Sequence, residues 1–321
     1  MTGPIPDGRR DVTTSEGDGT AALASGAAAR VVARDVLSVR GPDAGTYLQG
    51  QCSQDLDGLA IGASTESLLL SPQGKVDAYL RVTRTGEAAY LLDTDPGCGG
   101  AARLRLERFR LRTKVEVAPL DWVCLSVRGP AATAGSAAPG PDLALAVDWP
   151  GWSGVDLLGP RPADDPDLAG WLPDGAVRAA AGPWEAARIE AGVPMGGREV
   201  TESTIAAEVG LVARTVSFTK GCFTGQELVA RLDSRGSKVA RRLRGLVVAD
   251  GARPPVGATA WTADGEHEVG TVTSAAWSTG RGATVALATL HRRVEPPDHV
   301  TLRADGVEAV AEVRDLPFGG P

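Results

Sequence analysis

The chain has 321 residues, of which 43% are hydrophobic and 23% are charged, a composition typical of a soluble globular protein with a substantial core. A net charge of −7 and an isoelectric point of about 5.2 argue against a protein that coats nucleic acid. No segment approaches about 18 continuous apolar residues, so no membrane-spanning helix is predicted.

The four cysteines, Cys52, Cys98, Cys124 and Cys222, are far apart in the sequence. There is no C-x-x-C pair and no Cys–His cluster, so neither a closed metal site nor a disulfide framework is predicted. The first residues also lack the apolar segment of a secretory signal. We therefore expect a cytoplasmic protein with reduced thiols and no bound metal.

Residues 1–27 are rich in Gly, Thr, Asp and Pro, and we expect a disordered leader there. The elements that follow are a strand in 29–41, a helix in 41–56, three strands within 66–95, a helix over Pro96–Leu111 and a strand in 113–120. The turn sequences SPQG and RTGE divide the three strands. This β-α-β-β-β-α-β order predicts an α+β fold of the split-βαβ, ferredoxin-like kind.

A similar but weaker pattern recurs from Asp121, with strand signals at 122–129, 143–149 and 155–159 and a helix signal at Gly182–Gly192. Beyond Gly236, short β runs separated by turn residues predict a small closed barrel or sandwich. We therefore expect an α+β region over residues 28–236, with lobes of about 28–120 and 121–236, and a C-terminal β-barrel over 237–321.

The segment SFTKGCFTGQELVAR, residues 217–231, brings a lysine and a cysteine together just before a predicted helix. Its T-x-x-E sequence, ending at Glu227, fits a capping box, which places Cys222 just outside the helix N-terminus. The helix dipole and Lys220 would lower the thiol pKa from about 8.5 to roughly 7–8, whereas burial would raise it. These arguments leave a poised thiol and a buried, inert cysteine equally open. Arg231 is also spaced for an ion pair with Glu227.

The eight residues KGCFTGQE, which begin at Lys220, resemble the K-G-C-[Y/F]-x-G-Q-E signature of the YgfZ-type folate-binding proteins. Those proteins are relatives of the glycine-cleavage T-protein, an aminomethyltransferase, and are linked to the maintenance of iron–sulfur enzymes. Other segments agree in the same order, so the resemblance covers about residues 30–318. These segments are RGPDAGTYLQGQCSQDL, LLLSPQGKVDAYLRV, RIEAGVPMGGREVTESTIAAEVGL and EVGTVTSAAWS.

The resemblance implies a ring-like arrangement of the folate-binding α+β region and the barrel around a central hole. The hole would hold tetrahydrofolate or a one-carbon derivative of it. The signature would lie beside the hole, with Cys222 and Lys220 as functional groups. The implied cofactor-binding residues are Asp77, Arg188, Gly221, Phe223, Gln226 and Glu227. The two phenylalanines of the segment, Phe218 and Phe223, could stack on the pterin ring or pack in the core.

Asp77 lies in the sequence GKVDAYL, which resembles a strand that carries an acidic pair in the T-protein. In that family an aspartate of the pair handles the folate amine, and such a transfer needs a positioned carboxylate. Here Ala78 follows Asp77, so half of the pair is missing. The later segment GWSGVDLLGP keeps only Asp156 of the acidic residues that the family has there. These departures favour a binding or assembly role over a transferase.

The run RLRLERFRLRTK, Arg103 to Lys114, contains six basic residues and one acidic residue. It is either a solvated helix face or an anchor for the polyglutamate tail of folate or for the acidic surface of a partner. The later segment RGSKVARRLRG adds more positive charge, so a transfer-RNA contact is conceivable. The acidic total makes that contact the weakest of these options.

The leading hypothesis is a tetrahydrofolate-binding accessory protein that supports assembly or repair of iron–sulfur enzymes, with Cys222 as the functional thiol. A single cysteine cannot hold a stable cluster, so any cluster contact must be shared with a client or assembly protein. One alternative is a folate-dependent aminomethyl or one-carbon transferase that uses Asp77. Another is a folate-binding module in which Cys222 only packs. A non-enzymatic assembly factor is favoured over an enzyme.

Overall fold

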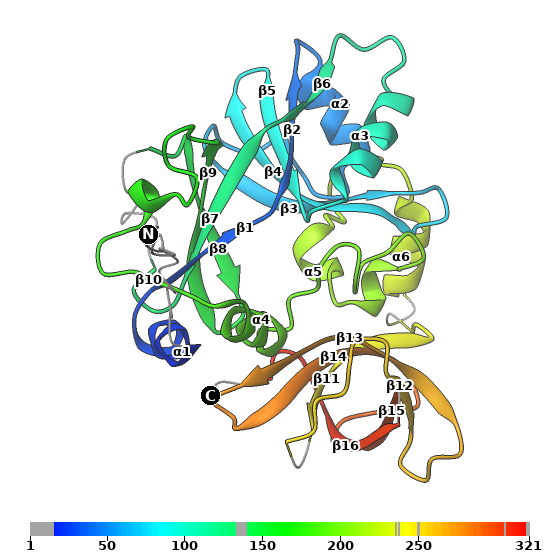
Figure 1. Cartoon of the computed structure of the whole chain (residues 1–321). Helices are drawn as coiled ribbons and strands as arrows, with labels where there is room; N and C mark the ends of the chain where they lie inside the picture. Colours follow the sequence, from blue (N-terminus) through cyan, green and yellow to red (C-terminus); the bar gives the residue numbers. More distant parts are fainter. Residues whose placement is uncertain are drawn as a thin grey trace, which may run out of the picture.

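The computed structural model describes residues 16–132, 140–234, 236, 238–248, 251–304 and 306–318 (Figure 1). These residues form two five-stranded sheets, the helices that accompany them and a closed six-stranded barrel. The mixed α+β architecture with a C-terminal barrel confirms the predicted fold class. Within the described part of the chain, no helix is long and apolar enough to cross a membrane.

The first sheet has the strand order β3-β4-β5-β2-β6 and is antiparallel throughout. Its elements in chain order are β2 (Asp35–Arg40), α2 (Ala44–Gln51), β3 (Ser64–Leu70), β4 (Val76–Gly86), β5 (Ala89–Thr94), α3 (Gly99–Arg108) and β6 (Glu116–Leu120). This is the order predicted from the sequence. Both helices pack on one face of the sheet, where Leu48 of α2 and Leu106 of α3 share a core cluster with Leu80 and Val82 of β4.

The second sheet has the order β10-β1-β7-β9-β8, and only the β1–β10 pair is parallel. The elements of this part are α1 (Glu16–Ser25), β1 (Ala28–Val32), β7 (Trp122–Arg128), β8 (Leu143–Trp149), β9 (Trp152–Pro160), η2 (Ala169–Trp171), β10 (Val177–Arg178) and α4 (Ala181–Glu190). Leu23 of α1 packs in one cluster with Trp184 and Ala187 of α4 and Ala28 of β1. This cluster holds the two helices against the sheet.

Three short helices lead from the second sheet to the barrel, whose strand order is β11-β14-β13-β12-β15-β16. The elements are η3 (Ala206–Glu208), α5 (Val212–Thr215), α6 (Gln226–Ser234), β11 (Arg241–Val248), β12 (Thr259–Thr262), β13 (Glu268–Ser278), β14 (Ala283–His291), β15 (His299–Ala304) and β16 (Val307–Arg314). Small and β-branched residues such as Ala260, Ala286, Val300 and Val313 fill the barrel core. Their modest size suits the narrow interior of a six-stranded barrel.

The structure corrects two predictions about the first part of the chain. Residues 29–41 form two strands, not one, because β1 ends at Val32 and β2 begins at Asp35 in the other sheet. β1 lies within the lobe predicted for residues 28–120, but it belongs to the sheet of the second lobe. The predicted disordered leader is also wrong for residues 16–25, which form α1 because Leu23 is buried against α4. Residues 1–15 of that leader lie outside the described residues.

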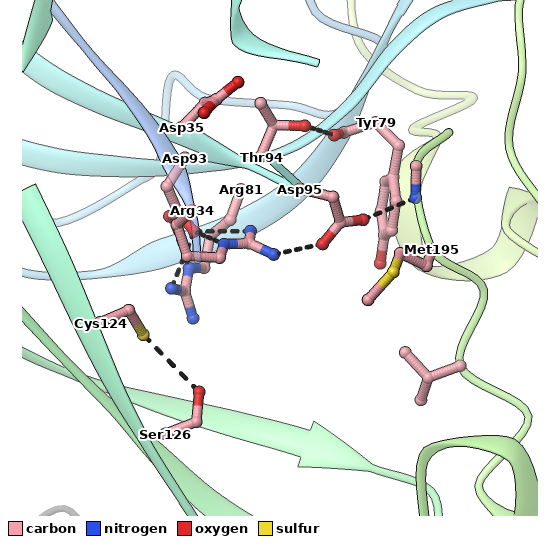
Figure 2. A network of polar contacts seen from close by, with 12 residues as sticks. Arg34, Asp35, Tyr79, Arg81, Asp93, Thr94, Asp95, Cys124, Ser126 and Met195 are labelled. Atoms are coloured by element: carbon pink, nitrogen blue, oxygen red, sulfur yellow. Dashed lines mark hydrogen bonds and ion pairs between the residues drawn. The ribbon is translucent and has the colours of Figure 1, made fainter. Parts of the chain in front are cut away.

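A chain of buried charges joins the two sheets, and Figure 2 shows its first three members. Arg34, in the crossing between β1 and β2, lies 2.6 Å from Asp93 of β5, which lies 2.9 Å from Arg81 of β4. Arg81 then reaches across to Asp156 of β9 in the other sheet at 2.9 Å. Arg128 of β7 ends the chain, 2.9 Å from Asp156. Positive and negative charges thus alternate along all five residues.

Burial alone would raise the pKa of Asp156 and Asp93, but the neighbouring arginines outweigh it. The net effect lowers the pKa of both carboxyls below their ordinary value of 3.8. A group whose pKa is lowered on folding stabilises the folded state above its unfolded pKa, and this stabilisation is lost as the pH falls through the folded pKa. The ion pairs of this chain of charges therefore form at neutral pH, and they are lost in acid when the two carboxyls are protonated.

We expect Arg81→Met to lower the free energy of unfolding at pH 7 by about 3–5 kcal/mol, because Asp93 and Asp156 would lose their shared partner in the interior. Arg293→Met, at an exposed arginine, is the matched control and should change it by less than about 0.5 kcal/mol. Denaturant unfolding measures both values. The deficit of the Arg81 variant should shrink below about pH 4, because protonated carboxyls need no cation. Equal stability of the two variants at pH 7 would contradict the assignment.

Candidate functional site at the junction of the two sheets and the barrel

A cavity of about 930 Å³ lies where the two sheets, α4 and the barrel meet. Its wall includes Tyr79 and Arg81 of β4, Ser126 of β7, Trp184 of α4 and Thr273 of β13. A cavity of this size is large enough for a small-molecule ligand or cofactor. All three parts of the fold contribute to the wall, so the cavity exists only when they are assembled.

Each carboxylate in the described part of the cavity wall is paired with an arginine. The pairs are Glu66 with Arg214, Asp95 with Arg34, Asp156 with Arg81 and Arg128, and Glu185 with Arg188 and Arg198. Burial alone would raise the pKa of Glu185, as it would for Asp156, but its arginine neighbours lower it. Asp156 and Glu185 are therefore poor proton acceptors, since a general base works best with a pKa near the working pH.

Arg128 and two tryptophans form one end of the cavity wall. The guanidinium carbon of Arg128 lies 4.5 Å from the ring centre of Trp149 and 5.6 Å from that of Trp184. The two indole rings meet edge to face, with their centres 5.7 Å apart. Arg128 Nε is buried and has no hydrogen-bond partner among the described residues. An unpaired buried donor costs about 1–3 kcal/mol, which the contacts of Arg128 with the two rings and with Asp156 must offset.

Asp95 connects the first sheet to the segment that follows α4 (Figure 2). Its Oδ1 accepts a hydrogen bond from Arg34 Nη1 at 2.7 Å, and its Oδ2 accepts one from the Gly196 N–H at 2.7 Å. A Cβ at Gly196 would lie only 2.9 Å from Cys98 Sγ, so this close approach requires glycine. Burial and the Asp95 carboxylate raise the pKa of the Cys98 thiol, which is therefore not activated.

Arg188, a predicted cofactor-binding residue, does line the cavity. Its guanidinium donates to the carboxylates of Glu185 and Glu199, to the Val193 carbonyl and to Ser274 Oγ of the barrel. These five bonds use all five donors of an arginine. Arg188 therefore joins α4 and the barrel and shapes the wall, and it has no donor left for a ligand.

Lys220, predicted to act on Cys222, caps the C-terminal end of α2. Its ammonium donates to the carbonyl oxygens of Gln49 at 2.7 Å, Cys52 at 2.6 Å and Gln54 at 2.9 Å. The carbonyls of Gln49 and Cys52 lie at the negative end of the helix dipole, and the three bonds use all three donors of the lysine. Burial lowers the pKa of Lys220. The lysine is thus an anchor for the signature segment, which corrects the prediction of a cation acting on the thiol.

The signature segment turns into α6 differently from the predicted capping box. The helix begins at Gln226, whose side-chain Oε1 accepts a hydrogen bond from the Phe223 N–H at 3.0 Å. Glu227 is exposed, and among the described residues it forms no ion pair with Arg231. Gly225 has a φ of +82°, and a Cβ there would lie 2.6 Å from the carbonyl oxygen of Ser71 in the β3–β4 turn. This glycine therefore lets the segment pack directly on that turn.

Cys222 is exposed, and so is Gly221 beside it. Burial raises the pKa of the Cys52 thiol to about 11 and that of Cys124 to about 12, so both are protonated at neutral pH. Cys222 does not belong to the described wall of the cavity. Phe223 is only 9% exposed and packs in a core cluster shared by β3, α4 and the barrel. The structure thus separates the thiol from the cavity and gives Phe223 a packing role.

Asp77, the predicted folate-handling carboxylate, also lies outside the described cavity wall. The pairing of β3 with β4 shifts register after Leu69, which leaves Asp77 in a bulge. Its carboxylate there accepts a bond from Arg105 Nε of α3 at 3.1 Å. Tyr79, two residues further along, lines the cavity instead. Asp77 therefore fixes α3 on the sheet.

A short side-chain link runs from the cavity to the signature segment. Tyr79 donates from its hydroxyl to Glu66 Oε1 at 2.9 Å, and Arg214 Nη2 donates to the same oxygen at 2.7 Å. Arg214 belongs to α5, which leads into the signature segment at Ser217. Burial raises the pKa of Tyr79, so its hydroxyl remains a donor. The cavity and the signature segment are thus separate, but the hydrogen bonds to Glu66 connect them.

Sequence reasoning missed Arg34, Arg81 and Arg128 as cavity residues. One signal was available, because Arg81 stands in the otherwise apolar run AYLRV and Asp156 in the run GVDLL. A charge inside a buried strand requires a partner of opposite sign. The neighbouring residues in the sequence do not identify that partner.

Residues 241–319 match the family model of the glycine cleavage T-protein C-terminal barrel domain. The structure is also similar to the glycine cleavage system aminomethyltransferase T from Bartonella henselae. The TM-score is 0.78 with 23% sequence identity, and the match covers 94% of this chain and 88% of that chain. The chain therefore has the T-protein fold, and its barrel belongs to the T-protein C-terminal barrel family.

Its relatives include proteins named tRNA-modifying protein YgfZ. The one from Edwardsiella ictaluri is 34% identical over 63% of this chain and 65% of its own length. The one from Yersinia enterocolitica is 28% identical over 88% of this chain and 89% of its own length. The mitochondrial iron–sulfur cluster assembly factor IBA57 homolog of Neurospora crassa is 24% identical over 71% of this chain, which spans 55% of that protein. The chain is thus a homologue of proteins named YgfZ and IBA57, at 24–34% identity.

We expect Lys220→Met to loosen the signature segment, because the carbonyls of Gln49, Cys52 and Gln54 would lose a charged donor worth about 1.5–3 kcal/mol. Amide hydrogen exchange of residues 217–224 should become about tenfold faster or more. Lys75→Met, at an exposed lysine of the neighbouring turn, is the matched control and should leave this exchange unchanged. Unaltered exchange in the Lys220 variant would rule out the anchoring role.

Proposed function

We propose that this protein binds tetrahydrofolate, or a one-carbon derivative of it, in the central cavity and supports the assembly or repair of iron–sulfur proteins without being an enzyme itself. In this proposal Cys222 is the working thiol. The T-protein fold and the relatives named iron–sulfur cluster assembly factor support the general role. The proposal for the cavity and the thiol rests on the geometry of this chain.

The described cavity residues fit a folate. Tetrahydrofolate combines a flat pterin ring with an anionic glutamate, so its site needs aromatic surface and cations. Trp149 and Trp184 offer aromatic surface at one end of the cavity. Arg30 donates from Nη1 to the Ala179 carbonyl at 3.1 Å, and with no other acceptor among the described residues it has donors left for a carboxylate. The volume of about 930 Å³ accommodates such a molecule.

The pairing of every described cavity carboxylate with an arginine is the observation that favours binding over transferase chemistry. Aminomethyl transfer needs a carboxylate that is free to manage protons on the folate amine. Asp77, the residue considered for that task, is instead engaged by Arg105 and stands outside the described cavity wall. This arrangement argues against the aminomethyltransferase alternative.

Cys222 supports the assembly role because it is exposed on an anchored segment, which argues against the alternative of a purely packing cysteine. A stable cluster normally needs four protein ligands, so a single cysteine would share any cluster with a partner. Since the thiol lies outside the described cavity wall, a partner could reach Cys222 while folate occupies the cavity.

We expect the protein to bind 5-formyltetrahydrofolate at one site by calorimetry, and Ala181→Trp to weaken this binding by at least about tenfold. Ala181 is an exposed residue of the cavity wall, so a larger side chain there would occupy ligand space. Ala21→Trp, at an exposed position of α1 outside that wall, is the control and should bind normally. The absence of binding at millimolar ligand would remove folate from the proposal.

We expect Cys222→Ser to abolish the support of iron–sulfur enzymes while leaving folate affinity within about twofold. The test restores each variant to cells that lack the protein and measures an iron–sulfur enzyme activity under oxidative stress. Cys98→Ser, at the other thiol that is not fully buried, is the matched control and should retain activity. Full enzyme activity with the Cys222 variant would refute the thiol role without touching folate binding.

A further inference from the structure

Large apolar side chains are exposed together on α3 and the turn that follows it. Leu104 is 67% exposed, Phe109 38% and Leu111 85%, so three of the nine exposed large hydrophobic residues of the described chain lie within eight positions. Together with the exposed Arg108, Arg112 and Lys114, they form what we call the α3 patch. Apolar residues gathered on a surface in this way mark an interaction site more often than scattered ones do.

The α3 patch is also strongly positive in an acidic protein. Residues 99–115 contain six basic residues and one acidic residue, a net charge of +5, whereas the whole chain has −7. Arg105 is buried in its bond to Asp77, and Arg103 pairs with Glu107. The cations left at the surface therefore stand beside the exposed leucines. Such a concentration of positive charge favours a partner of opposite sign.

The patch is held rigidly, as a binding surface should be. The Phe109 ring lies against the guanidinium of Arg105, with 3.9 Å between the guanidinium carbon and the ring centre. Arg105 is itself fixed by Asp77, by Gln51 Oε1 at 2.9 Å and by the Leu70 carbonyl at 3.2 Å. A rigid anchor loses little entropy on binding.

The turn after α3 is strained in a way that displays Leu111. Arg112 has a φ of +62° and is one of two described non-glycine residues in the left-handed region. Such a conformation costs on the order of 1–3 kcal/mol and persists where the surrounding structure imposes it. Here it follows directly on the most exposed of the large hydrophobic side chains.

A second cavity, of about 800 Å³, lies beside the patch between the two sheets and the first turns of α3. Leu104 belongs both to the patch and to the cavity wall, and Val31 and Trp122 are among the apolar residues of that wall. Gly100, Leu104 and Arg108 are four residues apart, so they follow one face of α3 from the cavity to the patch. An apolar side chain of a partner could enter here while its acidic residues meet the arginines.

We propose that the α3 patch binds an acidic protein segment that inserts an apolar side chain beside Leu104. RNA would use the positive charge but not the leucines, and the one exposed aromatic ring of the patch already has a guanidinium on its face. The residues of the patch are distinct from the wall of the central cavity and from Cys222, while the second cavity shares residues 31–34 with that wall. The interaction uses neither the groups proposed to hold folate nor the thiol.

The test uses fluorescence anisotropy with the full-length protein and a synthetic helical peptide that carries glutamates and a leucine stripe. Binding should be measurable at micromolar peptide, and the double variant Leu104→Ser/Leu111→Ser should weaken it by about tenfold or more. The double variant Ile61→Ser/Val310→Ser removes other exposed large apolar residues, at 58% and 52% exposure, and should bind normally. A matched peptide with serines in place of the leucines should bind at least about tenfold more weakly.

Charge is tested separately with Arg108→Glu/Arg112→Glu, which should also reduce peptide binding by about tenfold, and with Arg292→Glu/Arg293→Glu as an exposed control pair. Equal binding of the leucine and serine peptides would overturn the proposal, because it would reduce the patch to a charge effect. Tighter binding of a transfer RNA, lost in the same variants, would overturn it in favour of RNA. No peptide binding at millimolar concentration would overturn it as well. Calorimetry with 5-formyltetrahydrofolate on these variants keeps each result separate from the fate of the folate proposal.

Discussion

The alternating chain of charges from Arg34 to Arg128 is the constraint on which the rest of the structure depends. Each charge is taken from water on folding, and an unpaired charge in the interior would cost several kcal/mol. The bond from Arg81 to Asp156 is the step that crosses between the sheets, so the two sheets must meet in one relative position for it to form. That position also brings the sheet residues of the central cavity wall together and pairs its carboxylate Asp156 with Arg81.

The central cavity and Cys222 lie apart in the structure, although the signature alone predicted that they lie side by side. The cavity offers tryptophan rings and arginine donors for a ligand, whereas Cys222 stands on a surface segment anchored to α2 by Lys220. Glu66 accepts hydrogen bonds from both Tyr79 and Arg214, and these bonds connect the cavity to the helix that leads into the signature segment. In the function we propose, this separation lets the cavity hold folate while Cys222 meets a partner.

Local sequence patterns predicted the elements of the fold well, because periodicity and turn residues are properties of neighbours. The β-α-β-β-β-α-β order of the first sheet and the barrel strands after Gly236 followed from such patterns. The errors arose where a distant contact intervened. The pattern of residues 29–41 predicts one strand, but the structure has two strands there, with Arg34 between them. Arg34 lies outside both strands because it pairs with Asp93 and Asp95 of the first sheet. Asp77 reads as a site residue, but a bulge places it against α3.

By itself the sequence determined most of the elements, the fold class and the signature that marks Cys222, since all of these are encoded in short runs of residues. Only the tertiary structure decided what the charged side chains do. Lys220 finds its carbonyl partner on Gln49 at a separation of 171 residues, and Arg81 finds Asp156 at 75. The physical reason is that the partner of a buried charge is set by the packing of distant elements. The same packing decides which carboxylates of the cavity have an arginine partner. Each described carboxylate of the cavity wall has one.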